Sequence, residues 1–131
     1  MGKRIVVGGI VVFVAWTVVD FIVHGVVLKG LYEATASLWR PLAEMKLGVM
    51  YVASLIAAFA FAAVYAYLVR PKSLTAGVTY GLLFGIGTGV SMGYGAYSMM
   101  PIPYAMAFAW FAGTLVDAVL GGLLLGLLVK E

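Results

Sequence analysis

Four long apolar stretches divide the chain, at about residues 5–28, 48–69, 76–99 and 104–128. At a rise of about 1.5 Å per residue, a helix of such a length covers the roughly 30 Å hydrocarbon core of a bilayer. Successive spans joined in this way cross in opposite directions. The pattern therefore predicts an all-α integral membrane protein, a four-transmembrane-helix antiparallel bundle that forms a single transmembrane domain over residues 1–131.

The segments between the spans differ in length. "VRPKS" at 69–73 and "MMPIP" at 99–103 are short and contain proline, whereas "KGLYEATASLWRPLAEMK" at 29–46 is long. Apolar residues recur in this long segment at helical spacing, at Leu31, Ala34, Leu38, Leu42 and Met45. We expect a short interfacial helix between spans 1 and 2, with Trp39 at headgroup depth and a bend at Pro41. The alternative is a lid over an outer vestibule.

Composition supports the membrane assignment and excludes several functions. Of the 131 residues 65% are hydrophobic, which a soluble domain of this size could not cover with polar surface. The lipid bilayer is thus the first expected partner, and no basic stripe interleaved with aromatics indicates nucleic acid. Cysteine is absent and there is one histidine, so we expect no metal and no cofactor. No nucleophile–base set is visible, so an enzyme is not expected.

The basic residues are distributed unequally between the two ends of the predicted spans. One side carries Lys3, Arg4, Arg70, Lys72 and Lys130, and the other carries Lys29, Arg40 and Lys46. Cytoplasmic loops are enriched in lysine and arginine. We therefore expect both termini to be cytoplasmic, in a prokaryotic cell membrane.

Glycines follow a regular spacing in the third span. They stand at every fourth position, so they share one helix face, and further small residues follow in the fourth span: Gly77, Gly81, Gly85, Gly89, Gly93, Gly113, Ala118, Gly122 and Gly126. Small residues let helix backbones approach closely in lipid. The pattern predicts tight helix packing, against the same chain or another copy. The alternative is that the glycines thin the wall of a pore.

Three ionisable residues interrupt the apolar spans. Asp20 and His24 lie one helical turn apart in the first span, and Asp117 lies near the middle of the fourth. A central aspartate costs about 2.5–3.5 kcal/mol to insert, so such residues are expected to face protein or water. The phrases "TVVDFIVHG" and "TLVDAVLGG" surround the two aspartates. An inverted repeat is one explanation, and chance matching of aliphatic residues is the simpler one.

Depth along the spans suggests partners for these residues. Counting from the span centres puts His24 in one layer with Tyr51, Tyr94 and Trp110. It puts Asp20 a turn deeper, with Ser54 and Ser91. Four helices would then offer polar groups at adjacent levels, as in a buried polar network or a narrow path.

The sequence leaves two functions open. The first is movement of protons or a small cation or solute, carried by Asp20, His24 and Asp117 in a homo-oligomer or larger membrane complex. The alternative is a non-catalytic accessory subunit whose buried polar groups fix helix packing. Ligand binding at the same groups is a third interpretation.

Overall fold

A computed structural model describes residues 2–130, apart from the side chain of Leu42, and this part of the chain contains helices and turns only. Four helical stretches are long and apolar enough to cross a membrane: Gly2–Val27, Leu47–Leu68, Leu74–Met99 and Tyr104–Leu128. These bounds lie within a few residues of the predicted spans. The helical fold class and the four candidate spans are therefore confirmed.

Two of the spans contain a π-helical turn. Helix α1 (Gly2–Ile22) continues into η1 (Val23–Val27), and α4 (Leu74–Val90) continues through η4 (Ser91–Gly95) into α5 (Ala96–Met99). The amide of Leu28 donates to the carbonyl of Val23 at 2.8 Å and so closes the wider turn. Such turns recur at functional sites because they redirect the side chains that follow. His24 lies in the first of them.

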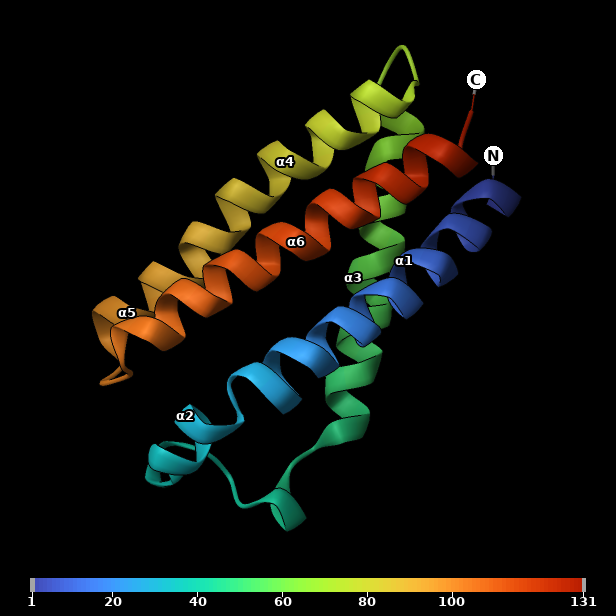
Figure 1. Cartoon of the computed structure of the whole chain (residues 1–131). Coiled ribbons are helices and arrows are strands. Elements are labelled where there is room, and N and C mark those ends of the chain that lie inside the picture. Colours follow the sequence, from blue (N-terminus) through green and yellow to red (C-terminus); the bar gives the residue numbers. More distant parts are fainter. Residues whose placement is uncertain (1, 131) are drawn as a thin grey trace.

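Helices α4 and α6 (Tyr104–Leu128) lie side by side in opposite directions (Figure 1). The predicted glycines lie in their contact: Gly77, Gly81, Gly85, Gly89, Gly93, Gly122 and Gly126 are all buried. A Cβ atom at Gly81 would overlap the backbone carbonyl of Ala118, and one at Gly77 that of Gly122. Only a glycine ridge permits this approach. The ridge packs within one chain and does not line a pore.

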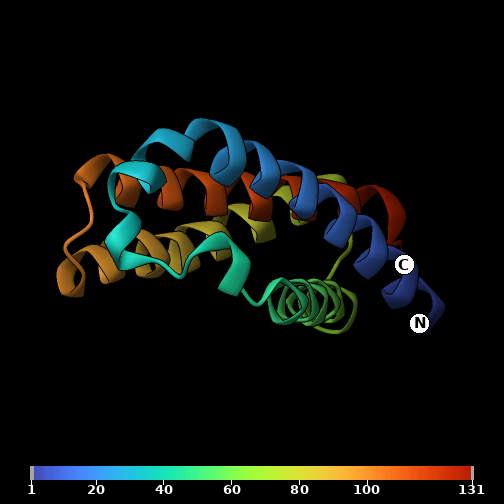
Figure 2. The same cartoon turned by 90° about the horizontal axis from the view of Figure 1, so that it is seen from below.

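Helix α3 (Leu47–Leu68) departs from the other three in direction. Figure 2 looks nearly along the axis of α3, whereas α1, α4 and α6 run across the same view. Its contacts with α4 use large side chains, since the Phe61 ring stacks on Tyr80 at 4.6 Å. Bulky contacts hold the two axes apart. The second half of α3 therefore packs in the core, whereas its first half diverges.

The connection between α1 and α3 is broken into short turns. It consists of α2 (Lys29–Ala34), η2 (Ala36–Leu38) and η3 (Leu42–Glu44), so a single continuous helix is not formed. The Thr35 hydroxyl donates to the carbonyl of Leu31 at 2.8 Å and accepts a bond from Trp39 Nε1 at 2.9 Å. A threonine that bonds in this way favours helix termination. The chain consequently folds back before Pro41.

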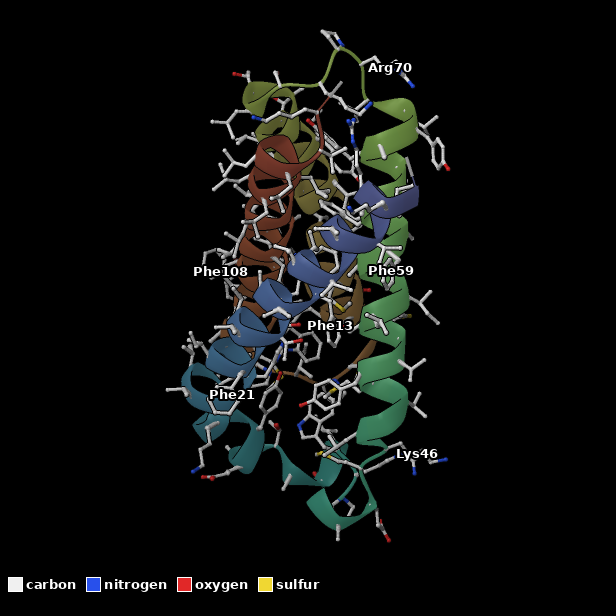
Figure 3. The ribbon with its side chains drawn as sticks, turned by 90° about the vertical axis from the view of Figure 1, so that its right-hand side faces the viewer. Phe13, Phe21, Lys46, Phe59, Arg70 and Phe108 are labelled. Carbon is white, nitrogen blue, oxygen red and sulfur yellow. The ribbon has the colours of Figure 1, made fainter. Side chains whose placement is uncertain are left out.

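The molecule has two distinct ends. The terminal end holds both termini and residues 69–73, and the opposite end holds residues 29–46 and 100–103 (Figure 1). Arg70 and Lys46 mark these two ends in Figure 3. Arg4 donates a hydrogen bond to the carbonyl of Lys130, which ties the terminal segments together. The two sets of basic residues thus lie at different ends, as the spans require.

Candidate functional site

A cavity of about 590 Å³ lies between the four long helices, in the half of the molecule nearer the opposite end. Its polar lining consists of Asp20, His24, Tyr32, Thr88, Thr114 and Asp117. Its apolar lining consists of Trp16, Ala57, Phe84, Met92, Trp110 and Ala118. Within residues 2–130, no lysine or arginine lines it. A mostly apolar cavity with a few convergent polar groups is typical of a ligand site.

The packing of α1 on α6 determines which side chains meet in this cavity. A Cβ atom at Gly113 would lie 3.2 Å from Val23 Cγ1, and one at Gly121 would lie 3.0 Å from Trp16 Nε1. Val23, which follows Trp16 in the chain, thus contacts Gly113, which precedes Gly121, so the two segments run in opposite directions. The turns between these two contacts therefore face each other.

Asp20 and Asp117 occupy those facing turns, and their carboxyl groups interact. Trp16 Nε1 donates to the backbone carbonyl of Asp117 at 2.6 Å. Asp117 Oδ1 is buried and has no hydrogen-bond partner among the side chains and backbone that the structure describes. A buried carboxyl oxygen without a donor is unfavourable. The atom is therefore suited to a proton shared with Asp20 or to a cationic guest.

A chain of hydrogen bonds runs from α6 to α1 through Tyr32. Trp110 Nε1 donates to Tyr32 Oη at 2.7 Å, and the same oxygen lies 2.5 Å from His24 Nδ1. The indole can only donate, so the phenol oxygen accepts from it, and we expect the phenol to donate its own hydrogen to His24 Nδ1. Neutral His24 then accepts at Nδ1 and carries its hydrogen on Nε2. The order of the chain is Trp110 to Tyr32 to His24.

Tyr32 remains a donor over the ordinary pH range. Burial raises the pKa of its phenol, and the negative charge of Asp20 acts in the same direction, although the hydrogen bond from Trp110 opposes them. Asp20 also interacts electrostatically with His24. The phenol, imidazole and carboxyl groups thus form one coupled set along α1 and α2.

Tyr32 reaches the cavity from α2, and later residues of the segment 29–46 pack around it. Trp39 packs edge-on against Tyr32 at 5.7 Å and against Trp110 at 5.9 Å. Both rings rest on a small core of Ile102, Met106 and Ala107 at the opposite end. Through Tyr32 the segment therefore forms part of the cavity wall. Trp39 packs against protein rather than standing apart at the surface.

Four residues predicted for the polar network do not line the cavity. Tyr51 is 47% exposed on the diverging half of α3, and Ser54 lies on that same half. Ser91 is exposed, and Tyr94 pairs its hydroxyl with that of Tyr104 at 3.0 Å. The prediction used depth alone, and depth does not determine which way a helical side chain points. The structure thus brings together Asp20, His24 and Asp117 but not the other four.

The cavity does not continue to the terminal end. Beyond Trp16 and Ala118 the space between the helices is filled by a buried apolar core of Val12, Ala58, Phe61, Ala62, Tyr65, Ala66, Leu125 and Val129. The interiors of such cores are packed as densely as organic crystals. In this conformation the apolar core therefore separates the polar groups from the terminal end.

No family model, curated protein or solved structure matches the chain. Within the described residues, no three histidine, aspartate or glutamate side chains form a group able to hold a metal ion. The chemistry of the cavity itself must therefore indicate the function. Its central feature is a carboxyl pair in an apolar chamber.

Proposed function

We propose that this protein is a small membrane transporter that exchanges protons for a small cation or solute at the Asp20–Asp117 pair. The observation that carries the proposal is the meeting of these two carboxyl groups in a cavity whose described lining includes no basic side chain. Intramembrane carboxyl groups that face a cavity recur in ion and proton pathways. A purely structural carboxyl would be expected to have a donor for each buried oxygen, and Asp117 Oδ1 has none among the described groups.

The proposed setting is an antiparallel four-helix bundle with the terminal end in the cytoplasm. The basic residues favour this orientation, since five stand at the terminal end and three at the other. The cavity then opens in the outer half of the membrane. The segment 29–46 lies at the outer surface and covers it in part.

The carboxyl pair supplies the proton chemistry. Two carboxylates in contact repel each other, so the pair is most stable when it shares one proton. A cation that enters the cavity replaces this proton and removes the repulsion. Next to the pair, His24 can accept or release a proton at Nε2 while Tyr32 holds its Nδ1 atom.

Transport through this cavity requires a second conformation. The apolar core at the terminal end closes the present one, so the pair must become open to the cytoplasm in another arrangement of the helices. Transporters commonly alternate in this way around a site near the middle of the membrane. Assembly with a second copy or with a larger membrane complex is part of the same proposal.

A non-transporting accessory subunit is the alternative. The hydrogen bonds from Trp16 to the Asp117 backbone and from Trp110 to Tyr32 favour it, because they join α1, α2 and α6. Polar bonds between helices can fix packing in a membrane without moving anything. On this view the cavity is a gap that a partner subunit or lipid fills.

Flux measurements in liposomes distinguish the two functions. Purified protein is reconstituted, and internal pH is recorded after a pH step between about pH 5 and 8, the range in which histidine titrates. Transport predicts proton flux above protein-free liposomes, lost in Asp20→Asn and in Asp117→Asn. The matched control is Glu33→Gln, an exposed carboxyl on α2 outside the cavity lining. Wild-type flux equal to protein-free liposomes would leave the accessory subunit as the better interpretation.

A further inference from the structure

We infer that the cavity binds a lipophilic organic cation, one that carries a single positive charge on an apolar or aromatic body. This inference rests on the proposed function and names the class of solute that the carboxyl pair exchanges for protons. Charge, wall chemistry and size each support it.

The charge follows from the polar lining. Asp20 and Asp117 place one shared negative charge in the chamber, and the described lining residues include no lysine or arginine to neutralise it. Asp117 Oδ1 is buried and has no hydrogen-bond partner among the described groups. An anion would be repelled, and a neutral guest would leave the charge unpaired. A monocation that takes the place of the shared proton leaves the charge of the pair unchanged.

The walls select an apolar body. Trp16, Phe84 and Trp110 supply three aromatic rings to the lining. Aromatic faces attract cations most strongly where water is excluded. Met92 adds a flexible, polarizable side chain that adapts to different shapes. Such walls suit an aromatic or alkylated cation better than a hydrated one.

Size excludes a bare metal ion as the main guest. A volume of about 590 Å³ falls within the range of small-molecule sites and far exceeds that of a single ion. Alkali and alkaline-earth cations also require several oxygen ligands, whereas the walls here are mostly apolar. The chamber therefore fits an organic cation.

Exchange at one site makes cation binding dependent on pH. The cation and the shared proton compete for the same carboxyl pair, so cation binding releases a proton. The apparent affinity should then rise with pH, by up to about tenfold per pH unit while one proton is displaced. The pH dependence of the affinity can be measured on the wild-type protein, so this test does not depend on whether a variant folds.

The experiment compares two probes of almost the same shape and opposite charge. Binding of tetraphenylphosphonium and of tetraphenylborate to the detergent-purified full chain is measured by titration calorimetry at several pH values. We expect saturable binding of tetraphenylphosphonium that strengthens with pH, and none of tetraphenylborate. Asp20→Asn and Asp117→Asn should abolish it, and Glu33→Gln should not change it.

The aromatic wall has its own matched pair of variants. Phe84→Leu should weaken binding by roughly three- to thirtyfold, the range expected for one lost cation–π contact. Phe108→Leu, an exposed ring on α6 outside the cavity lining, should leave binding unchanged. Equal effects of both changes would overturn the assignment of the ring.

The outcomes separate this inference from the proposed function. Equal binding of both probes, or binding that does not depend on pH, would overturn the inference, because both indicate simple partition into apolar surface. Proton flux that depends on Asp20 without any tetraphenylphosphonium binding would overturn it while transport stands. Binding that depends on the carboxyl pair without proton flux would support the inference and refute transport.

Discussion

Tyr32 connects three elements through one oxygen atom, although it lies outside every predicted span. Asp20, His24 and Asp117 could be predicted as site residues, because ionisable groups inside apolar spans are costly unless protein or water surrounds them. Tyr32 could not, since tyrosine is ordinary in a connecting segment. The break at Leu28, between η1 and α2, places it beside His24.

The order of hydrogen bonds predicts the tautomer of His24. It is the chain's only histidine, so its ring nitrogens can be observed without assignment. Nitrogen-15 NMR of the neutral form should show hydrogen on Nε2 and an acceptor at Nδ1. Tyr32→Phe removes the donor and should shift the Nδ1 resonance, whereas Tyr51→Phe on exposed α3 should not. A neutral ring protonated at Nδ1 would contradict the proposed order.

At the scale of elements, the glycine ridge was predictable and its partner was not. Spacing alone places the five regularly spaced glycines of the third span on one face, but it does not distinguish a partner in the same chain from a second copy. The short turn at 99–103 resolves this, because it returns α6 directly along the ridge. The direction of α3 was not predictable, since it depends on how Phe61 and Tyr80 stack.

Two glycines of α4 should respond oppositely to the same substitution. Gly81→Ala should destabilise the protein by about 1–3 kcal/mol, because the added methyl group meets the Ala118 backbone. Gly87→Ala should be neutral or stabilise by up to about 1 kcal/mol, since no described atom lies within 4 Å and alanine favours a helix. Thermal unfolding in detergent measures both. Equal effects would contradict the packing of α4 on α6.

The alignment of α1 with α6 can be tested by a disulfide in a chain that has no cysteine of its own. A Cβ atom at Gly113 would lie 3.8 Å from that of Val23, which matches the separation in a natural disulfide. We expect Val23→Cys with Gly113→Cys to cross-link on mild oxidation. Val23→Cys with Val116→Cys, an exposed position on α6, serves as the control. Preferential cross-linking of the control pair would contradict the placement of Asp20 opposite Asp117.

At the scale of the whole molecule, apolar length predicted four spans because lipid permits few other backbone arrangements. The cavity was beyond prediction, since it arises where the first half of α3 diverges and α2 folds back. Neither feature leaves a periodic signal in the sequence.

Orientation in the membrane has a direct test. Cysteines that replace Ser37 and Arg70, which are exposed at different ends, should react with an impermeant reagent from opposite sides of the membrane. The excess of basic residues at the terminal end predicts that Ser37→Cys reacts from outside. Reaction of both from one side would refute four crossings, and a simple reversal would refute only the orientation.

The contact between α4 and α6 limits how the molecule can move. Its seam places Gly77 and Gly81 against the backbone of α6, and Gly85 and Gly89 against Leu115 and Phe111, so sliding or tilting would bring atoms into collision. We therefore expect the two helices to move as one rigid unit. Helix α1 packs on α6, and the rings of Phe61 and Tyr65 on α3 pack against Tyr80 of α4. Because α3 meets α4 through side chains rather than backbone, we expect a motion that opens the closed end to shift α3 relative to α4 and α6, while these two helices keep their contact.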